Sequence, residues 1–457
     1  MDRMAHLGGR LMAGRQPRVA IVGAGFAGMA AAVTLADAGV RCVVFEAGKT
    51  LGGRARRIEY RGEVLDNGQH ILAGAYTELL RLMRLVGVSD AALRRVPLRL
   101  FIPPDFLLCA PRSTLIPRSL QMAVALLTAK GLTVADKLAA MRFMQALKRA
   151  KFKVDASMSV AALLTEHRQP QNLIDHLWQP LTISALNTPL ASASAQIFAN
   201  VLRDSLASTP EASDLLLPCV DLTALFPDPA AAWLIERGGE VRPGVRVKLV
   251  VAVGDGFDVI SDAPPLHADS VILAVGPHQL AGLLVNVMPP AIAYEPIVTV
   301  YFRFDQAVRL PEAMLGQTRG LAQWFFDRQA LNAGSHRDSS RAHESGLITA
   351  VISASGPHDL LSQEDLAERV LVELAQHVPD LPPPVWRKVV TEKFATFACT
   401  PNAHRPTAAT CYPGVFLAGD YVAGDYPATL EGAVRNGVSA ADKVKEYLHT
   451  SIAHTNQ

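Results

Sequence analysis

The sequence has few charged residues for its length. Only 19% of its 457 residues are charged and half are hydrophobic, whereas an average soluble domain carries about 25% charged residues. Intrinsic disorder needs the opposite composition, so the chain is expected to fold. Lysine and arginine together number 44, and aspartate and glutamate 42. This near balance provides no basic footprint for a nucleic-acid partner, and none is expected.

Cysteine is also scarce. The five cysteines are Cys42, Cys109, Cys219, Cys399 and Cys411. Their odd number, their wide spacing and the lack of a CxxC pair predict free thiols in a reducing compartment, and no metal site. Residues 1–18 contain four arginines but no apolar core, so a secretory signal is not expected there.

No uncharged stretch has the composition of a membrane-spanning helix, which needs about 20 consecutive apolar residues. The longest uncharged stretch, 177–202, is interrupted by Pro180, Asn187 and Pro189. The excess of apolar residues therefore predicts a large core, an apolar pocket or a surface that contacts a bilayer.

The first strong motif follows a short apolar run at 19–22, which is typical of a buried parallel strand. The run leads into the glycine-rich turn Gly23-Ala24-Gly25-Phe26-Ala27-Gly28, an expected helix at 29–38 and an expected strand at 41–45 that ends at Glu46. In such a βαβ unit the glycines permit a tight turn and close approach of a pyrophosphate, and the acid binds a ribose. The pattern predicts a dinucleotide site. No second GxGxxG occurs, so a separate NAD(P) domain is not expected.

Two further motifs resemble those of the amine-oxidase and carotenoid-desaturase class of flavoproteins. Leu51-Gly52-Gly53-Arg54 closely follows the ribose acid, and the apolar strand 414–418 ends in Gly419-Asp420 ahead of a helix. In that class the arginine brings positive charge to the pyrophosphate, the aspartate meets the ribityl region, and the helix N-terminus faces the flavin O2. The resemblance implies bound FAD. Two alternatives stay open, namely a solvated surface role for Arg54 and a helix-capping role for Asp420.

The resemblance also implies which residues contact FAD, including a valine at the adenine and a segment that passes the flavin, as in plant-type phytoene desaturases. These residues are Gly23, Ala24, Gly25, Phe26, Ala27, Gly28, Glu46, Ala47, Gly52, Gly53, Arg54, Gly68, Gln69, His70, Val247, Gly419, Asp420, Thr429 and Leu430.

The expected fold class is α/β, with a Rossmann-like FAD domain built from discontinuous segments and an α+β substrate domain that combines a mixed sheet with helices. We expect the FAD domain to comprise 17–76, 236–290 and 385–449, because the motifs and the returning strands lie there. The substrate domain is then expected at 77–235 and 291–384.

Segments between these motifs are more particular, and they are 178–181, 185–189, 198–204, 295–300, 351–356 and 424–432. Together they resemble the hydroxysqualene dehydroxylases of bacterial hopanoid synthesis, also described as squalene-associated FAD-dependent desaturases, within the amine-oxidase/phytoene-desaturase superfamily. The resemblance implies an FAD-dependent oxidoreductase that replaces the hydroxyl of hydroxysqualene, a C30 isoprenoid, by hydride from flavin N5 at an allylic carbon. A long, dry, apolar pocket would suit such a ligand.

The departing hydroxyl needs a proton, and four side chains are candidates for its donor. His70 comes first, because it lies in segment 66–76, which resembles the segment that passes the flavin. Asp66, Tyr76 and Tyr426 are the other candidates. The alternative that His70 only packs beside the cofactor stays open.

Other functions also stay open. A carotenoid or isoprenoid desaturase would use the same scaffold with the opposite direction of hydride transfer. A flavin amine oxidase would need an aromatic substrate cage, which the C-terminal motif does not reveal, and a non-catalytic lipid carrier would not need intact FAD motifs. The reductant, NADPH or a partner reductase, is not visible in the sequence.

Residues 115–153 are expected to form a helical region in which an apolar stretch is followed by alternating apolar and basic side chains from Lys137 to Lys153. This pattern is typical of a helix at a membrane interface, and also of an ordinary surface helix whose apolar face packs on the core. Because the implied substrate is insoluble in water, we expect a cytoplasmic protein with peripheral contact to the inner face of the cytoplasmic membrane.

Overall fold

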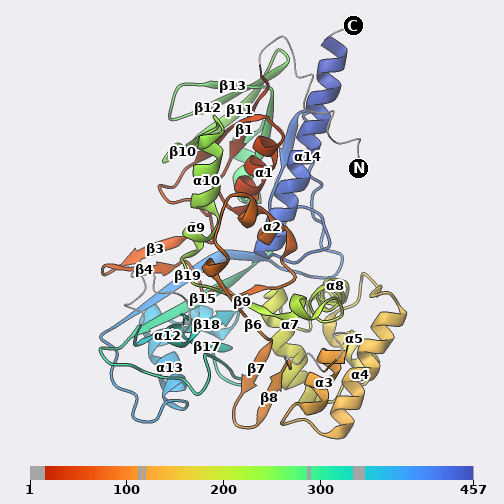
Figure 1. The fold of residues 1–457 in the computed structure, drawn as a ribbon, viewed down its shortest axis with the longest axis vertical. Coiled ribbons are helices and arrows are strands. Elements are labelled where there is room, and N and C mark those ends of the chain that lie inside the picture. Colours follow the sequence, from red (N-terminus) through yellow and green to blue (C-terminus); the bar gives the residue numbers. More distant parts are fainter. Residues whose placement is uncertain (1–15, 112–115, 117–119, 286–289, 333–344, 456–457) are drawn as a thin grey trace.

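The structure is a computed structural model that describes residues 16–111, 116, 120–285, 290–332 and 345–455 (Figure 1). A parallel sheet with its helices forms the upper part of the molecule in Figure 1, and an antiparallel sheet and a group of helices lie side by side below it. This arrangement confirms the predicted α/β class and the combination of a sheet with helices in the remainder, but all neighbouring strands of that second sheet are antiparallel, so it is not the mixed sheet expected there.

The parallel sheet collects strands from distant parts of the chain. In spatial order its five strands are β10 (Glu240–Pro243), β2 (Arg41–Glu46), β1 (Arg18–Val22), β14 (Ser270–Leu273) and β20 (Val415–Leu417). Every neighbouring pair is parallel. The strands expected at 19–22 and 41–45 are confirmed as the core of β1 and of β2.

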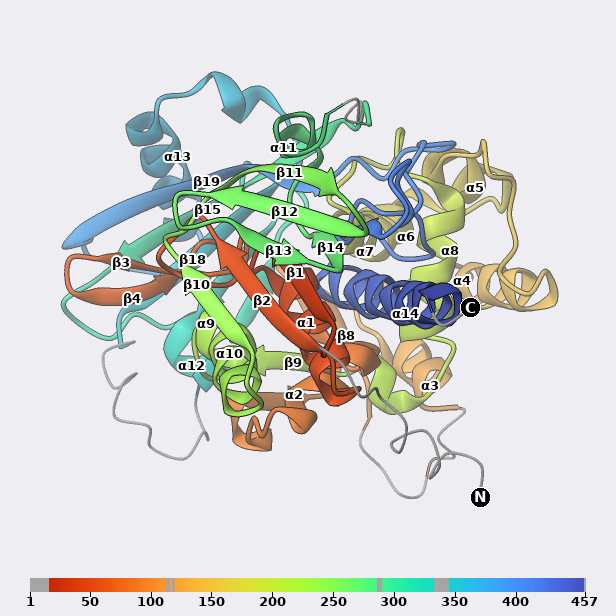
Figure 2. The same cartoon turned by 90° about the horizontal axis from the view of Figure 1, so that it is seen from above.

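Both faces of this sheet are covered, which explains why its strands are apolar without alternation. Val19 and Ile21 pack with helices on one face, and Ala20 and Val22 pack with a small antiparallel sheet on the other. The helices are α1 (Phe26–Asp37), α10 (Pro227–Glu236) and α14 (Leu430–Thr455), and the strands are β11 (Val247–Val253), β12 (Gly256–Ser261) and β13 (Leu266–Ala268). Figure 2 shows the two covering layers on opposite sides of β1 and β2.

Helix α1 begins earlier than the expected 29–38. Gly25 has the extended conformation of an N-cap, so the glycine-rich turn passes directly into the helix at Phe26. The first helical turn therefore lies within the motif itself, at the carboxyl end of β1.

The second sheet is antiparallel. Its strands, in spatial order, are β16 (Met314–Gly316), β17 (Trp324–Asp327), β18 (Leu347–Ser353), β15 (Tyr294–Arg303) and β19 (Trp386–Phe397). Alternate residues such as Val300 and Ile352 face α13 (Gln363–Ala375), whereas Ile297 and Val351 belong to the other face. Strand β19 lies within the expected cofactor segment 385–449, so that segment contributes to both sheets.

The helical part lies at the lower right of Figure 1. Its elements are α3 (Gln121–Thr128), α4 (Val134–Arg149), α5 (Val160–Glu166), α6 (Gln171–Leu173), a π-helical turn (Ile174–Trp178), α7 (Gln179–Leu186) and α8 (Ala195–Ser205). Thr133 and Asp136 form a reciprocal capping box that fixes the start of α4. Of the predicted region 115–153, residues 115 and 117–119 lie outside the described residues.

Short elements connect these parts. The strands are β3 (Arg57–Tyr60), β4 (Glu63–Asp66), β5 (Leu72–Ala73), β6 (Leu93–Val96), β7 (Arg99–Ile102), β8 (Phe106–Cys109) and β9 (Leu215–Pro218). The helices are α2 (Thr77–Leu85), α9 (Leu222–Leu225), α11 (Pro277–Leu283) and α12 (Arg328–Asn332), with 3-10 turns at Asp90–Ala92, Pro210–Ser213 and Pro357–Leu360. Within the described parts of the chain, no helix combines the length and apolarity needed to cross a membrane.

Candidate active site

A cavity of about 1300 Å³ runs from the carboxyl end of the parallel sheet into the space between the second sheet and the helical part. We call the end lined by Gly25 and Gly53 the glycine end, and the end lined by Leu100, Val201 and Trp324 the apolar chamber. Cavities that bind drug-sized ligands measure roughly 300–1,000 Å³. This cavity is therefore large enough for more than one small ligand.

The first glycine-rich turn can form only because glycine has no side chain at two of its positions. A Cβ on Gly28 would lie 1.9 Å from the carbonyl oxygen of Gly23, and a Cβ on Gly23 would lie 2.4 Å from the carbonyl oxygen of Ala274. The turn therefore packs directly on the neighbouring strand, and the N-terminus of α1 opens into the cavity. Free backbone N–H groups and the positive end of the helix dipole favour a phosphate at such a point.

The second glycine pair is bonded to the first. Gly52 N donates to Ala24 O at 2.9 Å, and a Cβ on Gly53 would lie 3.3 Å from the Cα of Gly25. Glu46 connects the same turns, since its Oε2 accepts from Ala24 N at 2.9 Å and its Oε1 accepts from Gly48 N at 2.8 Å. Bare backbone and one carboxylate thus form a narrow cradle at the glycine end.

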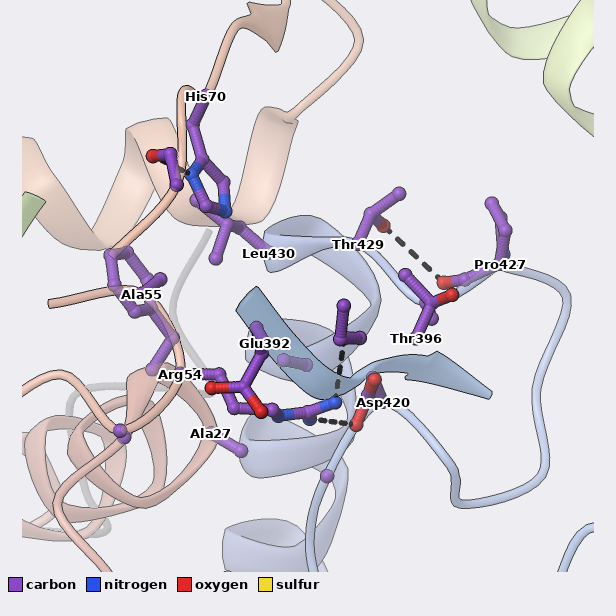
Figure 3. A pocket seen from close by; sticks show the side chains of 18 of the residues that line it. Ala27, Arg54, Ala55, His70, Glu392, Thr396, Asp420, Pro427, Thr429 and Leu430 are labelled. Atoms are coloured by element: carbon purple, nitrogen blue, oxygen red, sulfur yellow. Dashed lines mark hydrogen bonds and ion pairs between the residues drawn. The ribbon is translucent and has the colours of Figure 1, made fainter. Parts of the chain in front are cut away.

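The two halves of the chain meet through an ion pair. Arg54 Nη2 lies 2.5 Å from Asp420 Oδ1, and its Nη1 donates to the carbonyls of Phe394 and Ala395 (Figure 3). Burial acts to lower the pKa of Arg54, but the charge and hydrogen bond of Asp420 outweigh it and raise that pKa. Arg54 therefore stays charged. Its side chain is 38% exposed but is held by the ion pair and by two carbonyls, and Asp420 bonds Arg54 and does not cap α14, which begins at Leu430.

Most of the other residues expected near the cofactor also line the cavity. They are Phe26, Ala27, Ala47, Gly68, Gln69, His70, Val247, Gly419, Thr429 and Leu430. His70, Thr429 and Leu430 point toward the same space in Figure 3. Ala24 and Gly28 are not brought to the wall, since Ala24 bonds the neighbouring turn through its backbone and Gly28 packs on Gly23.

Three of the four candidate proton donors line the cavity, and these are His70, Tyr76 and Tyr426. The imidazole Nδ1 of His70 lies 2.9 Å from the carbonyl oxygen of Gly68. Burial, and then the charge of Glu431, raises the pKa of Tyr76. Burial raises the pKa of Tyr426 to about 12. Both phenols therefore keep their protons at neutral pH.

Asp66 lies elsewhere. It is buried and its Oδ1 accepts a hydrogen bond from Leu222 N at 2.8 Å, at the start of α9. The structure thus places this carboxylate outside the cavity wall, where it joins the end of β4 to the first residue of α9.

Sequence reasoning missed one residue of the cavity wall and one residue that supports the wall from behind. Asp204 lines it from the C-terminal end of α8, and Arg405 holds the loop that follows Asp420. Segment 198–204 was part of the family resemblance, but it carried no role for the carboxylate. Arg405 had no local signal, because its partners are backbone carbonyls that lie 15 to 21 residues along the chain.

Comparison with known proteins identifies the family. The family model described as flavin containing amine oxidoreductase matches residues 26–445. The chain belongs to this family. It is an FAD-dependent oxidoreductase, and the match extends from the first residue of α1 into α14, so it includes every strand of the two five-stranded sheets except β1.

Curated relatives define the family more closely. The chain is 30% identical to a hydroxysqualene dehydroxylase from Rhodopseudomonas palustris, over 93% of this chain and 98% of the relative. It is 29% identical to one from Sinorhizobium fredii, over 93% and 97% of the two chains. It is 26% identical to a probable zeta-carotene desaturase from Synechococcus elongatus, over 94% and 98%. Within the flavoprotein family, the chain belongs with the hydroxysqualene dehydroxylases.

Solved structures share the fold. An oxidoreductase from Methanosarcina mazei superimposes with a TM-score of 0.71 at 15% identity, over 93% of this chain and all of that chain. Cyclohexylamine oxidase from Brevibacterium oxydans gives a TM-score of 0.63 at 17% identity, over 95% of this chain and 100% of the other. These similarities confirm the fold of this flavoprotein.

The residues present at the glycine end fit FAD. A Cβ on Gly53 would narrow the space beside Gly25, where the cradle and the α1 N-terminus suit a pyrophosphate. Glu46 offers carboxylate oxygens for ribose hydroxyls. The N-terminus of α14, which begins at Leu430, supplies a positive dipole end on the side of Thr429.

Proposed function

We propose that this flavoprotein removes the hydroxyl group of hydroxysqualene to form squalene, as a step of hopanoid or triterpenoid synthesis. The observation that carries the proposal is the continuity of the cavity between the glycine end and the apolar chamber. A dinucleotide and a long apolar chain can therefore meet in one space. Three curated relatives that are hydroxysqualene dehydroxylases support the substrate class.

The proposed roles follow from the two ends. The segments 17–76, 236–290 and 385–449 supply the FAD contacts, with Arg54, Asp420 and Glu46 as the charged groups. The chemistry that bound FAD supplies is hydride transfer to the allylic carbon. The apolar chamber excludes water, which would otherwise capture an allylic cation of the substrate.

His70 is the proposed proton donor to the leaving hydroxyl. A carbonyl oxygen only accepts hydrogen bonds, so the contact with Gly68 O fixes the proton on Nδ1. Within the described residues no hydrogen bond reaches Nε2, which is therefore the nitrogen that an imidazolium would use as the acid. Tyr76 and Tyr426 are the alternative donors.

We expect His70→Ala to retain FAD but to slow dehydroxylation by roughly 100-fold, the usual scale of one general acid. Single turnover of prereduced enzyme with hydroxysqualene measures this rate. His267→Ala is the matched control, because His267 pairs with Asp258 on the small antiparallel sheet, away from the cavity. An unchanged rate in His70→Ala would remove His70 from the chemistry.

Anaerobic mixing tests the reaction and its direction. We expect hydroxysqualene to reoxidise reduced enzyme and to appear as squalene by mass spectrometry. The second candidate is a carotenoid-type desaturase, favoured by the zeta-carotene desaturases among the relatives. Bleaching of oxidised enzyme by phytoene or squalene, without turnover of hydroxysqualene, would support that candidate instead.

Peripheral membrane contact is proposed for the surface of α3 and α4. Leu120, Leu127 and Leu138 are 51%, 52% and 46% exposed, near Lys130 and Lys137. Apolar and basic groups together suit an anionic bilayer surface. Leu126 is only 8% exposed and belongs to the core, so charging it would test folding instead.

The membrane proposal predicts that wild type floats with anionic liposomes and that Leu127→Asp with Leu138→Asp does not. Leu360→Asp is the control, since Leu360 is 91% exposed in the 3-10 turn ahead of α13. Wild-type protein that stays with the soluble fraction would contradict the proposal.

A further inference from the structure

A pair of polar side chains interrupts the apolar chamber where α8 meets the loop between β20 and α14. Asp204, at the end of α8, and Tyr426, in that loop, both line the cavity. The Asp204 carboxylate acts electrostatically on the Tyr426 phenol and adds to the rise of its pKa, which burial causes in the first place. Arg203 neutralises this carboxylate through two contacts, at 2.7 Å and 3.1 Å.

The loop that carries Tyr426 is fixed in place. All of the guanidinium nitrogens of Arg405 donate to carbonyls of residues 420–426, at distances from 2.5 to 3.4 Å. Asn200 Nδ2 donates to Asp425 O at 3.0 Å, which ties the loop to α8. The guanidinium of Arg435 lies over the Tyr426 ring, 4.7 Å from its centroid. The phenol and the carboxylate therefore present a preformed polar group to the chamber.

The chemistry of this pair suits a ligand hydroxyl. Burial raises the pKa of Tyr426 to about 12, so the phenol remains protonated and can donate a hydrogen bond. A phenol oxygen also accepts hydrogen bonds, and a carboxylate has several lone pairs. A ligand hydroxyl can thus donate to the phenol oxygen or to the carboxylate, which keeps its contacts with Arg203. An apolar ligand would leave these acceptors unpaired in the chamber, at a cost.

We propose that Tyr426 and Asp204 form the subsite that binds the hydroxyl group of the substrate and so distinguishes hydroxysqualene from squalene. This inference rests on the proposed function, because it presumes that the chamber takes the hydroxylated C30 chain. The pair selects between two molecules that share their carbon skeleton. It also favours release of the product, which has no group to occupy the subsite.

The test compares the binding of the two isoprenoids to oxidised holoenzyme. Each ligand is added in detergent micelles and its dissociation constant is read from the change in flavin absorption. We expect Tyr426→Phe to weaken hydroxysqualene binding roughly tenfold, the usual scale of one hydrogen bond in a buried site, and to leave squalene binding unchanged. Tyr412→Phe is the matched control, since Tyr412 bonds Val285 O and does not line the cavity.

Asp204→Asn provides a second variant should Tyr426→Phe fail to fold, and the same selective loss of hydroxysqualene affinity is expected. Equal affinities of wild type and both variants for hydroxysqualene would overturn the subsite. An equal loss for both ligands would also overturn it, because it would indicate a structural role. If wild type binds neither isoprenoid, the proposed function fails first and the subsite with it.

Discussion

The two ends of the cavity are built in different ways. At the glycine end the walls are backbone and fixed charges, with Gly25 beside Gly53 and Arg54 paired with Asp420. In the apolar chamber the walls are side chains from β7, α7, α8 and the second sheet. The glycine end constrains residue type at single positions, whereas the chamber constrains mainly volume and the absence of water.

The comparison predicts that one methyl group is enough to break the glycine end. In Gly28→Ala the new Cβ would lie 1.9 Å from Gly23 O, so the turn must move and the phosphate cradle is lost. We expect purified protein with little bound flavin, measured by absorption after gel filtration. Gly424→Ala is the control, because the nearest atom to a Cβ there is 4.0 Å away and Gly424 does not line the cavity. Full flavin content in Gly28→Ala would show that the cradle is not needed.

A change of volume should break the chamber alone. Val201 lines the cavity from α8, and Val201→Trp would fill part of the space for the isoprenoid. We expect turnover of hydroxysqualene to fall by about tenfold or more, as overpacking does, with flavin content unchanged. Val372→Trp, at a position 58% exposed on α13, is the control. Loss of flavin in Val201→Trp would mean that the two ends do not act separately.

The same difference explains what the sequence could predict. The glycine end follows from short contiguous motifs, and strands β1 and β2 and the cavity positions of Glu46, Arg54 and Asp420 were predictable from them. Helix α1 begins at Phe26, before the expected start at residue 29. Its N-cap, Gly25, has no side chain to form a capping hydrogen bond, so the sequence does not show where the helix begins.

The lining of the apolar chamber could not be predicted from contiguous motifs. Its wall depends on how β15 and β18 pair and on which face of the second sheet α13 covers. Both depend on contacts between residues that are far apart in the sequence. Asp66 illustrates the limit, since a residue four positions before His70 turns away to bond Leu222 N. Asp204 and Tyr426 reach the same cavity only through the packing of α8 on the loop of Tyr426, so no local pattern indicated that they lie near each other.

Arg405 offers the finest test of the comparison, because its loop begins at Asp420 of the glycine end and finishes at Tyr426 of the chamber. A lysine in its place has three donors on one nitrogen and cannot reach carbonyls spread around a planar guanidinium. We therefore expect Arg405→Lys to weaken FAD binding by about tenfold, measured by titration of apoprotein. Arg387→Lys is the control, since its partners Glu364 and Glu368 are exposed carboxylates.

Because one loop serves both ends, Arg405→Lys should also reduce the preference for hydroxysqualene over squalene in the protein that retains FAD. Weaker FAD binding with an unchanged preference would mean that Arg405 orders Asp420 alone, and that Asn200 and Arg435 suffice to hold Tyr426.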